Sequence, residues 1–354
     1  EMSGLLVLQS EVARKVAGAL ALKLLPGDEA RLARVRSLDP EAYEAYLKGV
    51  QQRSAMTRAG FDEAERCFNF AIEKDPGYAA PWAGLSAVWV SRLQLNMAPR
   101  EEGLIKAKSA ALKALALDDG EIEARRVLAG ILTWLDWDWA AAERAWGRLF
   151  ELDPDNAMAL PGYSHFLLVT GRLDEAVAKS ERAMELDPYN VRTQSFHAQV
   201  LFHVRRFDEA IAAARKALDV QPSEVARTAL TDSLFMKGAH AEFMALERAR
   251  WASDPELAEV LEQGYAAKGV LGAEMSLAEA LAARYGRPGS VSAYTLANYY
   301  ARAGDKEGVI EWLEKAYLEH NNNLPYLRTP VFDLARSDPR FEDLARRIGL
   351  PVTS

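Results

Sequence analysis

Hydrophobic residues along this chain follow a helical spacing, and a proline or an aspartate interrupts the pattern at nearly regular intervals. Within the segments, apolar side chains recur three and four positions apart, which is the spacing of one face of an α-helix. The interruptions lie at Pro40, Pro76, Asp119, Pro154, Pro188, Pro222 and Pro255. Successive interruptions are 33 to 36 residues apart, except for a gap of 43 between Pro76 and Asp119. An interval of this length holds two helices, so the pattern predicts an all-α chain of repeated helical hairpins.

The same register of side chains recurs inside the intervals. A small residue stands 12 positions before an interruption, and a small or aromatic residue stands 8 positions before it. The pairs are Ala64 and Phe68, Ala107 and Ala111, Ala142 and Trp146, Ala176 and Ser180, and Ala210 and Ala214. A small side chain at a helix crossing allows two backbones to approach closely. We therefore expect these residues to be buried where the two helices of each hairpin cross.

With this register, the residues Trp82, Leu85, Ser86 and Trp89 make the chain resemble the tetratricopeptide repeat, which has a period of about 34 residues. The resemblance implies an all-α superhelix, an α-solenoid of antiparallel helix hairpins. Repeats of this kind pack on their neighbours and present extended surfaces for binding. The resemblance therefore favours a binding protein over an enzyme.

The pattern divides the chain into five parts. Residues 1–38 are expected to form an amphipathic helix and a linker, the tail of a missing upstream domain, because the sequence begins at a glutamate without a signal-peptide pattern. The regular repeats span 39–255. A degenerate repeat over 256–290 and a last hairpin over 291–320 follow, and residues 321–354 are expected to cap the stack.

The expected N-terminal helix carries one apolar stripe. Its members are Leu8, Val12, Val16, Leu20 and Leu24. Such a stripe must be covered, either by folding back on the first repeat near Tyr43 and Tyr46 or by pairing with another molecule. Because the polar link over 28–37 is short, we favour pairing, which predicts a homodimer through this helix.

Longer stretches carry a closer resemblance. They are LQSEVARKVAGALALKL at 8–24, DPEAYEAYLKG at 39–49, LDWDWAAAERAW at 135–146, ARAGDKEGVIEWLEKAYLEH at 301–320 and FDLARSDPRFEDLARRIGLP at 332–351. They resemble the C-terminal tetratricopeptide regions joined to bacterial class III adenylate cyclases, winged-helix transcription regulators and serine/threonine kinases. This resemblance implies a regulatory arm in the cytoplasm, or in the periplasm if the whole protein is a membrane-anchored regulator.

Composition and charge narrow the function further. The net charge of -8 repels a nucleic-acid backbone, so no nucleic acid is expected to bind this region. The single cysteine, Cys67, excludes an internal disulfide framework. No stretch is long and uncharged enough for a membrane span. The five histidines are scattered, and no combination of nucleophile, base and metal ligands is visible, so we expect no enzyme activity, cofactor or metal.

The candidate site is the concave side of the first helices of the hairpins. The repeat register places on it Arg126, Thr133, Trp134, Met158, His165, Leu168, Val169, Arg192, Gln199, Phe202, His203, Phe235 and Met236. An apolar groove with a few polar anchors suits a peptide or a helix, from another protein or from the chain's own upstream domain. The function expected is therefore protein interaction and regulation without catalysis.

Two other functions remain open at this stage. In one, the concave face around His165, Phe202 and His203 closes on a metabolite, and the chain is a small-molecule-sensing arm of a signalling protein. In the other, the repeats serve as an oligomerisation scaffold. A tight superhelix would also bury the same residues without any ligand, so an open channel would favour a peptide and a closed polar cavity a metabolite.

Overall fold

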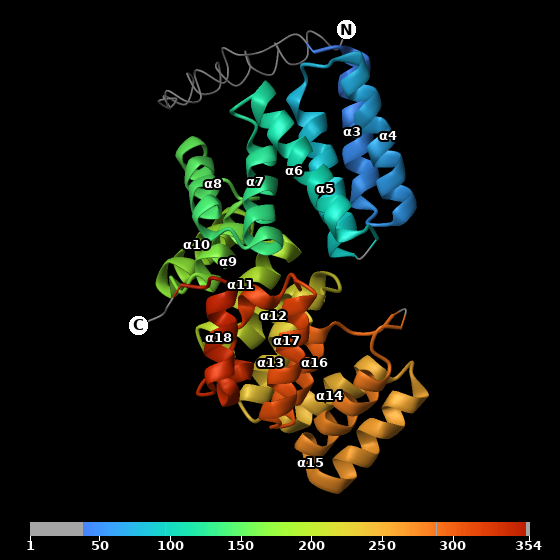
Figure 1. Ribbon diagram of the computed structural model, residues 1–354, viewed down its shortest axis with the longest axis vertical. Helices are drawn as coiled ribbons and strands as arrows, with labels where there is room; N and C mark the ends of the chain where they lie inside the picture. The colour runs from blue at the N-terminus through green and yellow to red at the C-terminus, as the bar shows by residue number, and fades with distance from the viewer. Residues whose placement is uncertain (1–37, 96, 288, 352–354) are drawn as a thin grey trace. The chain divides into compact units, whose positions relative to one another are not determined.

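The computed structural model describes residues 38–95, 97–287 and 289–351. Over these residues the chain is all-α, as expected, and consists of antiparallel helical hairpins (Figure 1). The chain divides into two compact units, Glu1–Pro154 and Asp155–Ser354. The expected N-terminal helix, its apolar stripe and the pairing that we predict through it lie outside the described residues.

The first unit contains three hairpins among the described residues. They are formed by α3 (Pro40–Ser54) with α4 (Arg58–Lys74), α5 (Ala79–Gln94) with α6 (Arg100–Leu117), and α7 (Ile122–Gly130) with α8 (Trp139–Leu152). A π-helical turn, Ile131–Asp136, extends α7. Trp137 then adopts a left-handed backbone conformation with φ of 59°, and Asp138 caps α8 by accepting a hydrogen bond from the amide of Ala141 at 3.0 Å.

The second unit continues the hairpins and ends in a short helical segment. Its elements are α9 (Leu160–Val169), α10 (Leu173–Leu186), α11 (Val191–His203), α12 (Phe207–Val220), α13 (Glu224–Met236), α14 (His240–Trp251), α15 (Pro255–Ala283), α16 (Ala293–Arg302), α17 (Lys306–Leu318), the 3-10 turns Leu324–Tyr326 and Pro330–Ala335, and α18 (Pro339–Arg347). The long α15 turns back on itself at Gly269, where φ is 61°. On either side of this turn the backbones approach so closely that a Cβ atom on Gly264 would collide with the carbonyl group of Gly272. Residues 256–290 therefore contain a tight hairpin of their own.

The crossing residues expected from the repeat register are buried. Ala64, Ala107, Ala142, Ala176 and Ala210 have no exposed surface, and each lies on the second helix of its hairpin. Their partners eight positions before each interruption are buried as well, which confirms the register through the five regular repeats. Small side chains at these positions allow the helices of a hairpin to pack closely, so the packing follows from the sequence pattern.

A buried charge network joins the helices of the last repeats. Arg302 on α16 donates hydrogen bonds from Nε to Oε2 of Glu274 on α15 at 2.7 Å and from Nη1 to Oδ1 of Asp232 on α13 at 3.0 Å. Tyr299 on α16 donates to Oε2 of Glu247 on α14 at 3.2 Å. All five side chains are buried, and Arg302 is the buried cation among three carboxyl groups, while the partly exposed Arg250 adds a positive charge near Asp232. Burial opposes the ionised form of these carboxyl groups, and the pKa values of both Asp232 and Glu274 are raised.

Glu274 is a carboxyl group whose ionisation this environment opposes. Burial raises its pKa to about 7, Arg302 opposes the rise, and the nearby Glu247 and Asp232 add to it. Its Oε1 atom is buried and has no hydrogen-bond partner among the described residues. An ionised oxygen in that position would lack compensation, so the network is most stable with Glu274 neutral.

The first prediction concerns the helix crossings. Replacement of Ala176 or Ala210 by Leu should lower the free energy of unfolding by about 1–3 kcal/mol, because extra volume at a packed crossing forces the helices apart. Ala178 is exposed on the same helix as Ala176, so Ala178→Leu is the matched control and should change little. Urea titrations followed by far-ultraviolet circular dichroism measure all three variants. Equal losses for Ala176→Leu and Ala178→Leu would contradict the register.

The second prediction concerns pH. Unfolded Glu274 releases its proton near its ordinary pKa of 4.5, whereas folded Glu274 keeps it to about 7. Between these values the folded state holds a proton that the unfolded state has released, so the contribution of Glu274 to stability falls as pH rises. Glu274→Gln cannot ionise, and its advantage over the wild type should grow from pH 5 to pH 8. Urea titrations across this range test the difference between the two proteins. A constant difference would show that Glu274 ionises in the fold as it does in the unfolded chain.

Candidate interaction surface

The expected concave residues of the first unit have different surroundings. Arg126 is partly exposed and pairs with Glu123 on the same helix at 2.7 Å. Thr133 is fully buried, donates to the carbonyl of Ala129 at 2.8 Å and accepts from Nε1 of Trp146 at 3.1 Å. Trp134 is half-buried and packs edge-on against Trp146, with ring centroids 6.4 Å apart. Thr133 is thus part of the hairpin core, and its expected place on a binding surface was wrong.

The burial of Thr133 matches that of its equivalents in the next two repeats. Leu168 and Phe202 stand at the same place of the register, and both are buried in ordinary α-helices. Thr133 lies in the π-helical turn and faces α8, where it accepts a hydrogen bond from the indole N–H of the buried Trp146. The sequence contains a signal for this contact. Trp146 at a crossing position is expected to be buried, and a buried indole N–H requires an acceptor.

In the second unit, the candidate residues divide into exposed and buried sets. Met158 and Arg192 are exposed, while Gln199, His203, Phe235 and Met236 keep partial exposure. Four others are buried and do not form part of an open surface, namely His165, Leu168, Val169 and Phe202. We use the term inner face for the side of α9 and α11 that bears His165, Arg192, Gln199 and His203, together with Met158 in the turn before α9.

The inner face is covered at one point by the end of the chain. The ring of Tyr326 lies 5.7 Å from the ring of His165 and 5.7 Å from that of His203, measured between centroids. Its hydroxyl oxygen is 2.8 Å from Nδ1 of His165. Asp333 pairs with Arg205, just after α11, at 2.6 Å. Residues 324–335, which we name the closing segment, therefore reach from the last hairpin back to α9 and α11.

The hydrogen bonds of His165 define its protonation. Nε2 lies 3.0 Å from the carbonyl oxygen of Phe196, which can only accept, so Nε2 carries the hydrogen. Nδ1 is then the acceptor for the hydroxyl of Tyr326. Burial lowers the pKa of His165 to about 4, so the ring is neutral at pH 7. Burial also lowers the pKa of His203 to about 3, and the neighbouring His165 and Arg336 lower it further.

A continuous stack of side chains leads from the surface to this hydrogen bond. The guanidinium of Arg192 lies 5.1 Å from the centroid of the Phe196 ring, and that ring stacks on His165 at 4.1 Å. Tyr326 meets His165 at an interplanar angle of 78°. The arrangement presents one exposed cation, one fixed hydrogen-bond acceptor and several ring faces, and such groups recognise an aromatic side chain.

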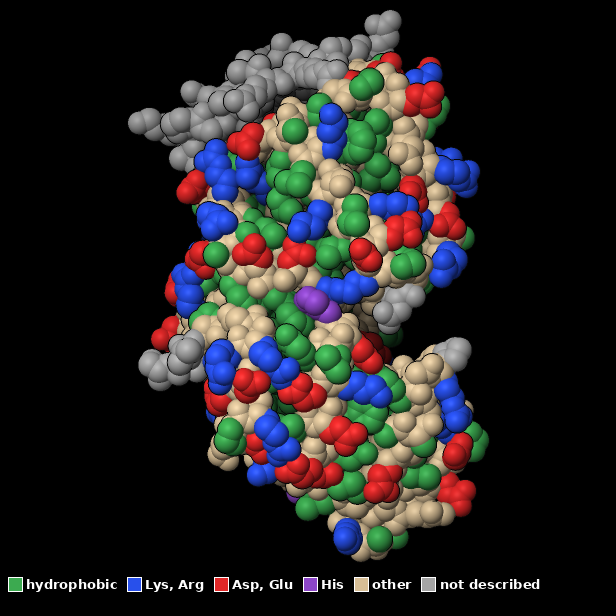
Figure 2. Space-filling view, in the orientation of Figure 1, with side chains coloured by type: hydrophobic (Ala, Val, Ile, Leu, Met, Phe, Trp, Pro, Cys, Tyr) green, Lys and Arg blue, Asp and Glu red, His purple; other side chains and the backbone are tan. Residues whose placement is uncertain are grey.

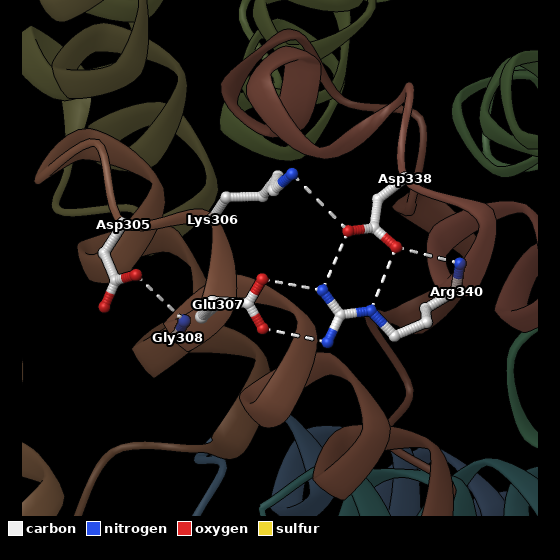
Figure 3. Close-up of polar contacts among 6 residues, drawn as sticks. All are labelled: Asp305, Lys306, Glu307, Gly308, Asp338 and Arg340. Atoms are coloured by element: carbon white, nitrogen blue, oxygen red, sulfur yellow. Dashed lines mark hydrogen bonds and ion pairs between the residues drawn. The ribbon is translucent and has the colours of Figure 1, made fainter.

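The C-terminal helix α18 is attached to α17 by ion pairs of its own. Figure 3 shows Arg340 of α18 between Asp338 and Glu307 of α17. Its guanidinium donates to both oxygens of Glu307 at 2.8 and 2.9 Å and to Oδ2 of Asp338 at 2.8 Å. Hydrogen bonds from Arg340 hold the pKa of Asp338 well below its usual range. These contacts keep α18 on α17 independently of Tyr326.

Three observations on the described residues concern metal binding, membrane insertion and the single cysteine. Within residues 38–95, 97–287 and 289–351, no group of three or more His, Cys, Asp or Glu side chains is arranged to hold a metal ion. None of the helices in this part of the chain has the length and apolarity that a membrane span needs. Cys67 is buried beside Phe68, and burial raises the pKa of its thiol, so it packs as a small apolar group.

Comparison with curated proteins finds two kinds of relative. Over 136 residues the chain is 31% identical to a protein of Rhizobium meliloti (strain 1021) named as an adenylate cyclase, an alignment that covers 38% of this chain and 23% of that protein. Over 174 residues it is 24% identical to the transcriptional regulator HilA of Salmonella typhimurium, covering 48% of this chain and 30% of HilA. The chain spans less than a third of the length of either relative. No family model matches the chain.

Solved structures show the fold. Human IFIT1, determined as a dimer with m7Gppp-AAAA, superposes with a TM-score of 0.55 and 15% identity over 96% of this chain and 76% of that chain. A tetratricopeptide protein of Thermus thermophilus aligns with a TM-score of 0.45 and 18% identity over 55% of this chain and 98% of its own. By its repeat period, its buried crossing residues and its antiparallel hairpins, the chain is an all-α protein of the tetratricopeptide-repeat fold.

Proposed function

We propose that this chain is a non-catalytic region that binds a protein segment through its inner face and thereby regulates an output domain. The observation that carries the proposal is the pair Met158 and Arg192. They stand 34 positions apart, at the same place of the repeat register, and both are exposed, the first an apolar side chain and the second a cation. A repeated exposed position of this kind suits an extended or helical ligand that crosses several repeats.

The relatives support a regulatory role. Parts of this chain align with a protein named as an adenylate cyclase and with a transcriptional regulator, whose outputs differ in chemistry. A region shared between different outputs is better explained as a binding and control element than as the source of either output. The partner is then a separate protein or the output domain itself, and we place this interaction in the cytoplasm.

The chemistry of the inner face favours a protein ligand. Both ring nitrogens of His165 are engaged, by the carbonyl of Phe196 and the hydroxyl of Tyr326, so this histidine has no free lone pair with which to act as a base. The space beside it holds Tyr326, which disfavours a metabolite as its natural occupant. Figure 2 shows acidic and basic side chains interspersed over the visible face, with hydrophobic ones between them. Mixed charge of this kind suits a polypeptide better than a polyanion.

The third prediction tests the inner face. The double variant Met158→Ala with Arg192→Glu should weaken the binding of a partner by about 2 kcal/mol or more, which is about 30-fold in affinity, as loss of anchor residues does. Val220→Ala with Lys216→Glu makes the same chemical changes at exposed positions of the second helix α12 and should leave binding unchanged. Affinity capture from the source cell, followed by quantitative mass spectrometry and titration of the captured protein, compares the three.

Circular dichroism first verifies that both double variants keep the helical content of the wild type. A captured protein whose affinity is the same for all three chains would place its binding site elsewhere. Absence of any protein above the bead control would contradict the proposed function itself.

A further inference from the structure

We infer that the inner face between α9 and α11 is a recognition site for a tyrosine side chain, occupied by the chain's own Tyr326 until a partner segment presents a tyrosine in its place. This inference rests on the proposed function, because it assigns the kind of segment that the inner face binds. The site consists of His165, His203 and Phe196, with Arg192 at its outer edge.

Selectivity for a phenol follows from the state of His165. Its Nδ1 is an acceptor because Nε2–H is committed to the carbonyl of Phe196 at 3.0 Å. The hydroxyl of Tyr326 satisfies this acceptor at 2.8 Å. His165 is 1% exposed, so a phenylalanine in the same place would leave Nδ1 buried and unpaired, and a carboxylate would meet a lone pair. The ring faces of His165 and His203 fit the rest of the phenol.

The way in which Tyr326 is held favours replacement of its ring by a tyrosine of a partner. Tyr326 as a whole keeps partial exposure, whereas His165, against which its ring packs, is buried. The backbone of Tyr326 has an anchor that does not involve its ring, because the hydroxyl of Tyr294 donates a hydrogen bond to the Tyr326 carbonyl oxygen at 3.2 Å. Its neighbours Leu324 and Leu327 are fully buried. The ring can therefore rotate outward while the closing segment stays packed, and an incoming tyrosine restores the same hydrogen bond and ring contacts.

The other contacts of the C-terminal region do not involve the Tyr326 ring. The ion pair between Arg205 and Asp333 lies at the surface, with side chains that are 50% and 34% exposed. The contacts of Arg340 with Glu307 and Asp338 hold α18 in place (Figure 3). Neither of these contacts involves the Tyr326 ring, so both can remain when the ring is replaced. The expected partner is thus a polypeptide that presents a tyrosine side chain.

The test uses 4-methylphenol, which has the structure of the tyrosine side chain, as a ligand for a variant that lacks the Tyr326 ring. Tyr326→Ala should melt below the wild type and should bind 4-methylphenol in calorimetry, with a saturable rise in its melting temperature. Toluene has the same shape without the hydroxyl and should bind about tenfold more weakly, the effect of one lost hydrogen bond to a buried acceptor. The wild type should not respond. Tyr189 is 80% exposed, so Tyr189→Ala is the matched control and should behave as the wild type does.

Equal binding of 4-methylphenol and toluene to Tyr326→Ala would overturn recognition of the hydroxyl, and binding of neither would overturn the site. If Tyr326→Ala fails to fold, Tyr326→Phe replaces it in a melting experiment. This variant should melt below the wild type because Nδ1 of His165 loses its partner, and an unchanged melting temperature would overturn the inference.

A partner captured by the wild type separates this inference from the proposed function. Tyr326→Ala should bind that partner at least tenfold more tightly, because no internal tyrosine competes. A synthetic peptide of residues 321–333 should displace the partner, and the same peptide with phenylalanine at the tyrosine position should do so less well. If a partner binds the inner face but neither Tyr326→Ala nor the peptide alters its affinity, the tyrosine exchange is wrong and the proposed function stands. If Tyr326→Ala binds 4-methylphenol but no partner is captured, the tyrosine site stands and the proposed function is wrong.

Discussion

The close approach of two helices inside each hairpin is the constraint on which the rest of this structure depends. Alanine at the crossing position of the regular repeats allows the backbones to meet, and each of these alanines is completely buried. Because the crossing is tight, the first helix of a hairpin presents the same set of positions in every repeat. The exposed side chains of Met158 and Arg192 occupy equivalent places for this reason, and so do the buried ones of Leu168 and Phe202. The repeat spacing thereby determines both the core and the candidate surface.

In the later repeats, a buried charge network joins neighbouring helices where small side chains are missing from the crossings. In the sixth hairpin the bulky Phe243 is buried among the packed helices, and Arg302 connects α13, α15 and α16 through Asp232 and Glu274. A buried ion cluster contributes specificity of packing more than net stability, because desolvation offsets most of the attraction. Here it orients α16 and, through it, α17, from which the closing segment departs. The position of Tyr326 at the inner face therefore depends on a charge network in other repeats of the same unit.

The closing segment changes how the inner face is interpreted. The sequence pattern left two interpretations of the residues around His165, Phe202 and His203, a groove for a peptide or a closed cavity for a metabolite. In the structure Tyr326 of the same chain packs against His165 and His203. The hydrogen bond that holds it is neutral on both sides, since burial keeps His165 uncharged at pH 7. Such a contact is specific in geometry and adds no charge that a partner would have to neutralise.

The sequence alone determined the all-α class, the hairpin period and the buried alanines, because these depend on residues within about 34 positions of one another and on helix geometry. The division between exposed and buried candidates came only from the tertiary structure. Thr133 is buried against Trp146, and a segment 161 positions away in sequence covers His165. The spacing of residues within one repeat could not predict the second contact, because it depends on the path of the chain through all the hairpins between α9 and residues 324–335.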